Sequence, residues 1–252
     1  MSQEYPYESS DEELDDEIPY SNEMESPTIS EDDSTETANL PAPSEGRISY
    51  RGATSDPFFG FLIAIALSVG LTPLLPVHAD LRYTLAWGAL AGVSVLSWLL
   101  GSTERIGQEK PENIAWGAIF GVLLGVPFLI FLRDPILVPA SQQIFPMMSP
   151  GTLLAYLVFV MPISETLFFR GLLQRQLVFW VVGLLATLWN IVLFFPVMWD
   201  KVVAFPAVAV VIAITLLMMN MIYVYVRERN GLAAAWICQI LANLIMLFIP
   251  FL

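Results

Sequence analysis

Residues 202–226 read VVAFPAVAVVIAITLLMMNMIYVYV, a run of 25 residues without a charged side chain. A helix needs about 20 apolar residues to cross the hydrocarbon core of a bilayer, so this run predicts a transmembrane helix. Six further apolar runs reach about 18 residues or more, near the lower limit for a span. The sequence therefore predicts an all-α polytopic bundle of seven spans within residues 47–252. The six further runs cover residues 57–77, 84–101, 114–132, 152–169, 178–199 and 232–252.

The composition of the whole chain also indicates a membrane protein. Its 252 residues are 56% hydrophobic, with a mean hydropathy of +0.65. Soluble domains are only about 45–50% apolar, even with glycine counted. We therefore exclude a soluble enzyme and a nucleic-acid-binding protein, and we expect the lipid bilayer to surround residues 47–252.

The first 46 residues differ from the rest of the chain. Residues 1–45 hold 15 of the 24 acidic residues and none of the 11 Lys and Arg, so the net charge of −13 belongs to this segment. Large apolar residues are too few there to offset the entropy lost on ordering the backbone. We expect residues 1–46 to be a disordered acidic cytoplasmic tail, either simply solvated or docking a soluble partner. The first residues lack the pattern of a signal peptide, so we expect the later helices to drive insertion.

The basic residues predict the orientation of the spans. With the tail inside, eight Lys or Arg lie in inside segments, and only Arg82, Arg133 and Lys201 lie in outside loops. This asymmetry follows the positive-inside rule. An eighth span built from the connector at 133–150 would remove it, so we favour seven spans and interpret the connector as a short re-entrant or interfacial piece.

Small residues recur at a regular spacing in the predicted spans. Gly117, Gly121 and Gly125 are spaced by four, which places them on one helix face and favours close packing of two helices. A Trp-Gly-Ala triplet occurs at both 87–89 and 116–118. A duplicated transporter repeat is the alternative explanation of this echo, and the shortage of intramembrane charges disfavours a transporter. Tryptophans near span ends are interpreted as anchors at the membrane interface.

Two turn signals flank the spans discussed next. Ser149-Pro150 predicts a helix N-cap followed by proline at the first helical position. Asn230-Gly231 predicts a turn before the last span.

Glu165 is the carboxylate that lies well inside an apolar run, in the stretch PISETLFFRGLL at residues 162–173. An ionised carboxylate there costs a few kcal/mol or more, so such residues usually face the bundle interior or a wet cavity and are functional candidates. Arg170 lies about 140° around an ideal helix from Glu165. We therefore expect Arg170 to reach towards the membrane edge or to contact a neighbouring helix.

The stretch Glu165-Thr166-Leu167-Phe168-Phe169-Arg170-Gly171 resembles the first motif of the CAAX prenyl protease and bacteriocin-processing family. These proteins are intramembrane endopeptidases related to the type II CAAX prenyl proteases, and their motif is Glu-Glu-x-x-x-Arg, commonly continued as Phe-Arg-Gly. The resemblance covers the motif region 150–252. It implies a helical intramembrane endopeptidase, integral to a bacterial plasma membrane.

Three positions depart from the family's motifs. Thr166 stands at the second Glu of the first motif, Met198 at the His of a Phe-x-x-x-His motif, and Gln239 at the His of a His-x-x-x-Asn/Asp motif. In the family, the first Glu and the second-motif His are held to activate water for attack on a peptide carbonyl. Methionine cannot transfer a proton, and a neutral amide cannot replace a titrating imidazole. The matching positions are Glu165, Arg170 and Asn243.

We expect neither a cofactor nor a metal ion. The chain has a single cysteine, Cys238, and a single histidine, His78, whereas the usual zinc sites combine several such ligands. His78 falls in the loop after the first span, on the side of the membrane opposite Glu165, so it does not replace the missing histidines.

Three interpretations of Glu165 stay open at this point. An active endopeptidase would use it as a base to cut a membrane peptide near the cytoplasmic face. A pseudoprotease would keep a polar cavity that binds a membrane peptide or partner helix without cutting it. A structural carboxylate would only bond Arg170 or Asn243. The lost histidines favour the pseudoprotease, with a cavity that opens to the cytoplasm. We expect around this cavity Glu165, Arg170, Gln239 and Asn243, with Met198 narrowing it.

Overall fold

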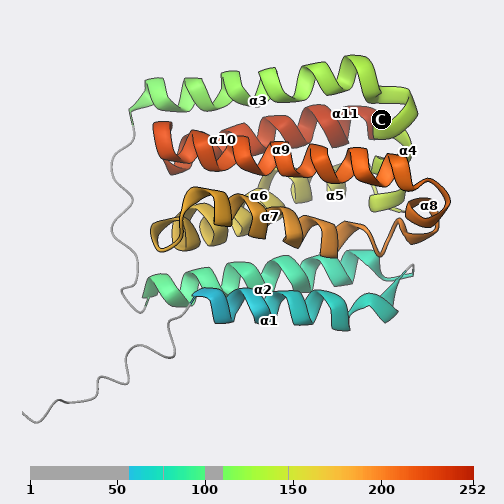
Figure 1. The fold of residues 1–252 in the computed structure, drawn as a ribbon, viewed down its shortest axis with the longest axis horizontal. Helices are drawn as coiled ribbons and strands as arrows, with labels where there is room; N and C mark the ends of the chain where they lie inside the picture. The colour runs from blue at the N-terminus through green and yellow to red at the C-terminus, as the bar shows by residue number, and fades with distance from the viewer. Residues whose placement is uncertain (1–56, 76, 100–109, 147) are drawn as a thin grey trace, which may run out of the picture. The chain divides into compact units, whose positions relative to one another are not determined.

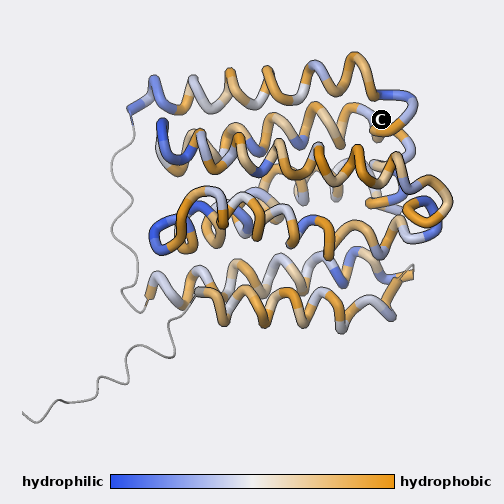
Figure 2. Tube along the Cα trace, viewed as in Figure 1, coloured by the Kyte–Doolittle hydropathy of each residue, from blue (hydrophilic) through white to orange (hydrophobic). Residues whose placement is uncertain are grey.

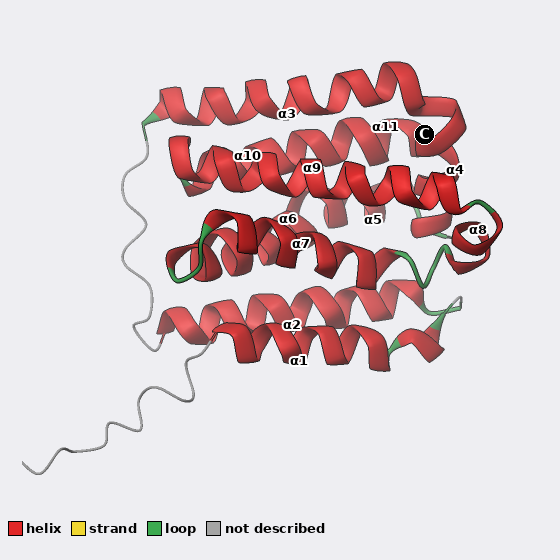
Figure 3. Cartoon of the chain, viewed as in Figure 1, coloured by secondary structure: helices red, strands yellow, loops and turns green. Residues whose placement is uncertain are grey.

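The computed structural model describes residues 57–75, 77–99, 110–146 and 148–252, and these contain helices and turns but no β-strand (Figure 3). The prediction of an all-α fold is confirmed for this part of the chain, while the predictions for residues 1–46 lie outside it. The α-helices in Figure 1 are α1 (Pro57–Gly70), α2 (Ala79–Leu99), α3 (Pro111–Leu132), α4 (Val138–Ile144), α5 (Pro150–Ala155), α6 (Met161–Glu165), α7 (Phe179–Phe194), α8 (Trp199–Ala204), α9 (Pro206–Asn230), α10 (Leu232–Asn243) and α11 (Ile249–Phe251).

Several of these helices join into longer ones through π-helical segments. The helix Pro111–Ile144 has 34 residues and contains α3 and α4, so most of the predicted connector is helical. The helix Pro150–Arg175 has 26 residues and contains α5 and α6; we call it the motif helix. The helix Leu232–Phe251 has 20 residues and contains α10 and α11. The π-helical segments are Arg133–Leu137, Tyr156–Val160, Thr166–Leu172 and Leu244–Phe248. Short 3-10 turns are Thr72–Leu74 and Leu173–Arg175.

Four of the described helices are long and apolar enough to cross a membrane: Pro111–Ile144, the motif helix, α9 and Leu232–Phe251. The helices at 58–74 and 179–194 are apolar but shorter. Large apolar side chains are exposed along these helices; Phe131, for example, is 77% exposed. Figure 2 shows that hydrophobic residues predominate along the helices. Such a surface suits a lipid bilayer, so the chain is an all-α integral membrane protein.

The motif helix lies in the middle of the helical unit. It packs against α2 and against α10, while α7 packs against α9 and α1, and α3 runs along α10. In Figure 1 the segments 133–146 and 195–205 lie at one end of the helices, which we call the connector end. Residues 175–178 and 230–231 lie at the other end, which we call the turn end.

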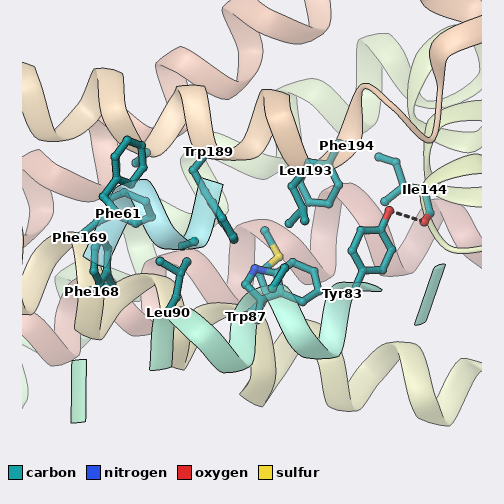
Figure 4. Close-up of a cluster of buried hydrophobic side chains, with 14 of the residues drawn as sticks. Phe61, Tyr83, Trp87, Leu90, Ile144, Phe168, Phe169, Trp189, Leu193 and Phe194 are labelled. Carbon is teal, nitrogen blue, oxygen red and sulfur yellow. Dashed lines mark hydrogen bonds between the residues drawn. The ribbon is translucent and has the colours of Figure 1, made fainter. Parts of the chain in front are cut away.

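A cluster of buried aromatic side chains joins α1, α2, α7 and the motif helix (Figure 4). Trp87 and Phe194 pack edge to face with ring centroids 6.3 Å apart, and Phe168 and Phe169 with centroids 5.1 Å apart. Tyr83 donates its hydroxyl to the Ile144 carbonyl at 2.8 Å. Trp87 is fully buried in this cluster, so its interpretation as an interface anchor is wrong.

Arg82 is buried in α2, so its assignment to an outside loop is also wrong. Its guanidinium donates to the Leu193 carbonyl at 2.6 Å, the Val192 carbonyl at 3.0 Å, and the Ser68 carbonyl and hydroxyl, each at 3.2 Å. These carbonyls lie in the last turns of α7 and α1, where backbone acceptors have no partner within their own helix. Arg82 thus caps two helices at once.

Candidate functional site

The motif helix begins as predicted and carries Glu165 near its middle. The Ser149 hydroxyl accepts from the Thr152 backbone N–H at 3.2 Å, and Pro150 follows at the first helical position. Glu165 is the last residue of α6, where the helix widens into the π-helical segment Thr166–Leu172. Segments of this kind are frequent at functional sites. Glu165 is only 1% exposed and faces the interior of the bundle.

Side chains from three helices donate hydrogen bonds to the Glu165 carboxylate. Its Oε1 accepts from the indole Nε1 of Trp87 at 3.1 Å and from that of Trp189 at 3.2 Å. Its Oε2 accepts from Gln239 Nε2 at 2.7 Å. These donors come from α2, α7 and α10. Both oxygens therefore have partners, and hydrogen bonds offset part of the cost of burying the group.

Gln239 is the junction between Glu165 and two other side chains of the motif helix. Its Oε1 accepts from Thr166 Oγ1 at 3.1 Å and from an Arg170 terminal nitrogen at 3.0 Å. Because its amide donates to the carboxylate and accepts from the guanidinium, Gln239 links the two charged groups. Through these bonds Gln239 joins α10 to the motif helix.

Arg170 serves neighbouring helices, and its side chain does not extend towards the membrane edge. It is fully buried, and its second terminal nitrogen donates to Asn220 Oδ1 at 3.0 Å. Its guanidinium lies 5.1 Å from the centre of the Tyr223 ring, within the range of a cation–π contact. The backbone carbonyl of Arg170 accepts from Arg227 Nε at 3.0 Å. The wider π-helical turn after Glu165 replaces the ideal helix on which the 140° separation was calculated.

A cavity of about 80 Å³ lies beside the carboxylate, with room for a few water molecules at about 30 Å³ each. Of the residues predicted around it, Glu165, Gln239, Asn243 and Met198 do line it, whereas Arg170 is not among its lining residues. Most of the lining is apolar. The polar lining residues are Glu165, Asn190, Thr215, Asn220, Tyr223, Gln239 and Asn243.

The cavity extends towards the connector end. Its lining includes Ile136, Ala140 and Ile144 from the segment after α3, and Met198 from the turn between α7 and α8. The expected cytoplasmic opening corresponds to the turn end in the topology predicted from the basic residues. The structure places the lining towards the other end, because Met198 and Asn243 lie towards the connector end from Glu165.

Asn243 and Tyr223 bring unpaired polar atoms to this cavity. Asn243 Nδ2 contacts the Met161 sulfur at 3.5 Å, but Asn243 Oδ1 is buried and accepts from none of the described residues. The Tyr223 hydroxyl is likewise buried and unpaired within the described part of the chain. One acceptor and one hydroxyl are thus free to bind whatever enters the cavity.

The three glycines predicted to pack against a neighbouring helix hold α3 against α10, which carries Gln239 and Asn243. A Cβ at Gly117 would overlap the Ala234 backbone, and a Cβ at Gly121 would lie 2.8 Å from the Cys238 carbonyl oxygen. Gly125 faces Ile245 in the same way. Gly88, in the similar segment of α2, has no such neighbour within 4 Å among the described residues. The three glycines of α3 therefore form a packing surface. The similar Trp-Gly-Ala triplets of α2 and α3 do not indicate a shared role.

The sequence did not predict that Trp87 and Trp189 donate hydrogen bonds to Glu165, or that Arg170 makes a cation–π contact with Tyr223. An indole in an apolar run has the same sequence signal whether it anchors a helix at the interface or donates inside the bundle. His78 is exposed at the start of α2 and does not line the cavity. Among the described residues no group of three His, Cys, Asp or Glu could hold a metal ion.

Comparison with protein families gives a match over the second half of the chain. Residues 148–245 match the family described as type II CAAX prenyl endopeptidase Rce1-like. This segment begins at the connector end and contains Glu165, Arg170, Met198, Gln239 and Asn243. The predicted resemblance to CAAX protease-like proteins is confirmed. No curated protein and no solved structure matches the chain.

Proposed function

We propose that the chain is a pseudoprotease of the CAAX protease-like family, since residues 148–245 match the Rce1-like family. It binds a membrane peptide or partner helix in the cavity beside Glu165 and does not cut it.

The observation that carries this proposal is the set of hydrogen bonds that the Glu165 carboxylate already accepts. A general base must reach the water it activates by a hydrogen bond. Both oxygens of Glu165 already accept from neutral donors, and Gln239 accounts for the 2.7 Å bond to Oε2. Met198 lines the same cavity at the position of the family's second-motif histidine. Neither Gln239 nor Met198 can carry a proton between water and a leaving amine.

The unpaired atoms of the cavity support binding of a peptide group. A backbone N–H can donate to Asn243 Oδ1, and a backbone carbonyl can accept from the Tyr223 hydroxyl. Leaving such buried groups unpaired costs about 1–3 kcal/mol each, so a ligand that pairs both gains affinity. The apolar remainder of the lining suits a segment that comes from the membrane.

The proposed topology has seven spans in a bacterial plasma membrane, with the acidic tail, residues 1–46, in the cytoplasm and residues 47–252 as one transmembrane domain. In this proposal the helices at 58–74, α2 and 179–194 add three passes to the four long ones. Leaving out the buried Arg82 and Arg170 gives seven basic residues on the tail side and two on the other. The positive-inside asymmetry therefore persists.

Peptide termini in membranes test the absence of cleavage. Termini are compared by mass spectrometry among cells that express wild type, Glu165→Ala, Glu112→Ala or no protein. Glu112 is an exposed carboxylate outside the cavity and serves as the matched control. We expect the same termini in all samples. Termini found with wild type and Glu112→Ala, but absent with Glu165→Ala, would instead establish an active endopeptidase with Glu165 as base.

Photocrosslinking tests the binding. A crosslinking amino acid replaces Leu247, which lines the cavity, or Leu252, which is 75% exposed and serves as the control. We expect a peptide adduct from position 247, absent from position 252 and reduced by Asn243→Leu. Deleting residues 1–46 leaves this adduct in place, whereas loss of a soluble partner on deletion would assign that partner to the tail.

A further inference from the structure

A second hollow lies on the surface of the helical unit, between the motif helix and the start of α10. It encloses about 360 Å³. Thr166 is buried at its base, and the remaining lining side chains are half-buried and apolar in character. We call this hollow the α10 groove. Its lining residues are Ile163, Thr166, Leu167, Leu232, Ala233 and Trp236.

One hydrogen-bond donor of this groove has no partner. The indole Nε1 of Trp236 is buried and donates to none of the described residues. The nearby Thr166 hydroxyl is already used, since it donates to Gln239 Oε1 at 3.1 Å. A buried indole N–H usually finds an acceptor, and leaving it unpaired is unfavourable, most of all in a bilayer where water is scarce.

The position of Trp236 in its helix points to the chemistry of the missing acceptor. Trp236 is the fifth residue of α10, so it lies about 6 Å along the axis from Leu232, at the 1.5 Å rise of an α-helix. The last turn of α9, just before α10, carries Arg227 and Arg229. Basic residues followed within one or two turns by tryptophan are typical of the membrane interface, where phosphates, ester carbonyls and the first methylenes of lipids succeed one another.

We propose that the α10 groove binds a diacyl phospholipid of the bilayer. Its acyl chain covers the apolar side chains of the groove, and the ester carbonyl at the head of that chain accepts from Trp236 Nε1. None of the six residues that line the groove is charged, so the ester and the chain set the selectivity, and the headgroup does not. This site is separate from the Glu165 cavity. Lipid binding here does not depend on whether Glu165 is catalytic, part of a peptide-binding site or only structural.

The test compares two phosphatidylcholines with the same chains, one with ester and one with ether linkages. Only the ester lipid offers a carbonyl. Full-length protein in detergent is equilibrated with equal amounts of both, and the lipid retained is measured by native mass spectrometry. We expect wild type to retain about fivefold more ester lipid, which corresponds to about 1 kcal/mol for one hydrogen bond.

Matched variants assign the preference to the groove. Trp236→Phe keeps the ring and removes the donor, and we expect it to retain the two lipids equally. Trp180→Phe alters a tryptophan that is 61% exposed on α7, and the fivefold preference should persist. Ala233→Leu fills the groove and should lower retention of both lipids severalfold.

Three results would overturn the proposal. The first is equal retention of both lipids by wild type. The second is an ester preference that survives in a Trp236→Phe protein with the wild-type unfolding temperature. The third is a protein dimer that excludes lipid and dissociates in Trp236→Phe, which would identify a second copy of the chain as the occupant of the groove.

Discussion

Gln239 Nε2 lies 2.7 Å from Glu165 Oε2 and donates to it, while the same amide accepts from Arg170 at 3.0 Å. A neutral imidazole also offers one donor and one acceptor. The amide at the position of the family's histidine can therefore keep a hydrogen-bond network of the same kind, but it cannot titrate. The network preserves the packing of the motif helix on α10 whether or not catalysis survives.

Replacing Gln239 with leucine should destabilise the protein strongly. The change removes one donor to Glu165 and one acceptor shared by Thr166 and Arg170, and hydrogen bonds to charged groups contribute about 1.5–3 kcal/mol each. We expect a loss of about 2–4 kcal/mol in the free energy of unfolding. Gln239→His retains a donor and an acceptor and should lose less than about 1 kcal/mol. Denaturant unfolding in detergent measures both, and a Gln239→Leu protein as stable as wild type would contradict the network.

The two indole donors to Glu165 should be coupled. Trp87→Phe and Trp189→Phe each remove a hydrogen bond to Oε1, at an expected cost of about 1–3 kcal/mol, and each also leaves a small cavity that adds to this cost. Because both bonds end on one oxygen, the double variant should differ from the sum of the singles by about 0.5 kcal/mol or more. Trp180→Phe, at an exposed tryptophan, is the control and should be neutral within about 0.5 kcal/mol. Strict additivity of Trp87→Phe and Trp189→Phe would argue against a shared acceptor.

The parts of the site that could be predicted from sequence are those with a local signal. Glu165 stands out because a carboxylate in an apolar run is costly, and Ser149 and Gly231 mark helix ends by their own chemistry; Gly231 indeed has a φ of 96°. The two indole donors to Glu165 could not be predicted. Trp87 and Trp189 lie 78 and 24 residues from Glu165 in the chain, and only the packing of α2 and α7 on the motif helix brings them together.

The burial of Arg82 was unpredictable for a related reason. A basic residue near the end of an apolar run is ordinarily assigned to a loop. Arg82 is buried because the last carbonyls of α1 and α7 converge on it, and that convergence is a property of the tertiary fold. The direction in which the cavity extends likewise depends on the turn that carries Met198, beyond the end of α7.

Alanine at Gly117 should separate α3 from α10. The added Cβ overlaps the Ala234 backbone, which cannot rotate away as a side chain can. We expect a loss of about 1–3 kcal/mol in the free energy of unfolding, typical of overpacking. Gly88→Ala is the matched control, since its Cβ would have no neighbour within 4 Å among the described residues and alanine favours the helix by about 0.5–1 kcal/mol. The opposite order of stability would place the three glycines of α3 away from the helix contact.

Replacing Arg82 with methionine should destabilise the ends of α1 and α7. The change leaves the Ser68, Val192 and Leu193 carbonyls without their donor, at a cost of about 1–3 kcal/mol for each buried group that water does not reach. Hydrogen exchange of amides in these last turns should quicken. Arg133→Met removes an exposed charge at the same end and should change neither stability nor exchange by a measurable amount. Equal effects of the two variants would mean that Arg82 acts only through its charge.

Restoring both histidines tests whether the lost chemistry is confined to two positions. Met198 and Gln239 both line the cavity beside Glu165, so Met198→His with Gln239→His puts two imidazoles where proton transfer to a bound peptide needs them. General acid–base groups contribute about 10²–10⁴ in rate, and we expect the double variant to produce new peptide termini that are absent with wild type. Adding Glu165→Ala to this double variant should abolish these termini. A folded double variant that stays inactive would instead locate the defect in Thr166 or in the indole bonds that hold Glu165, because these are the other differences between this carboxylate and a free base.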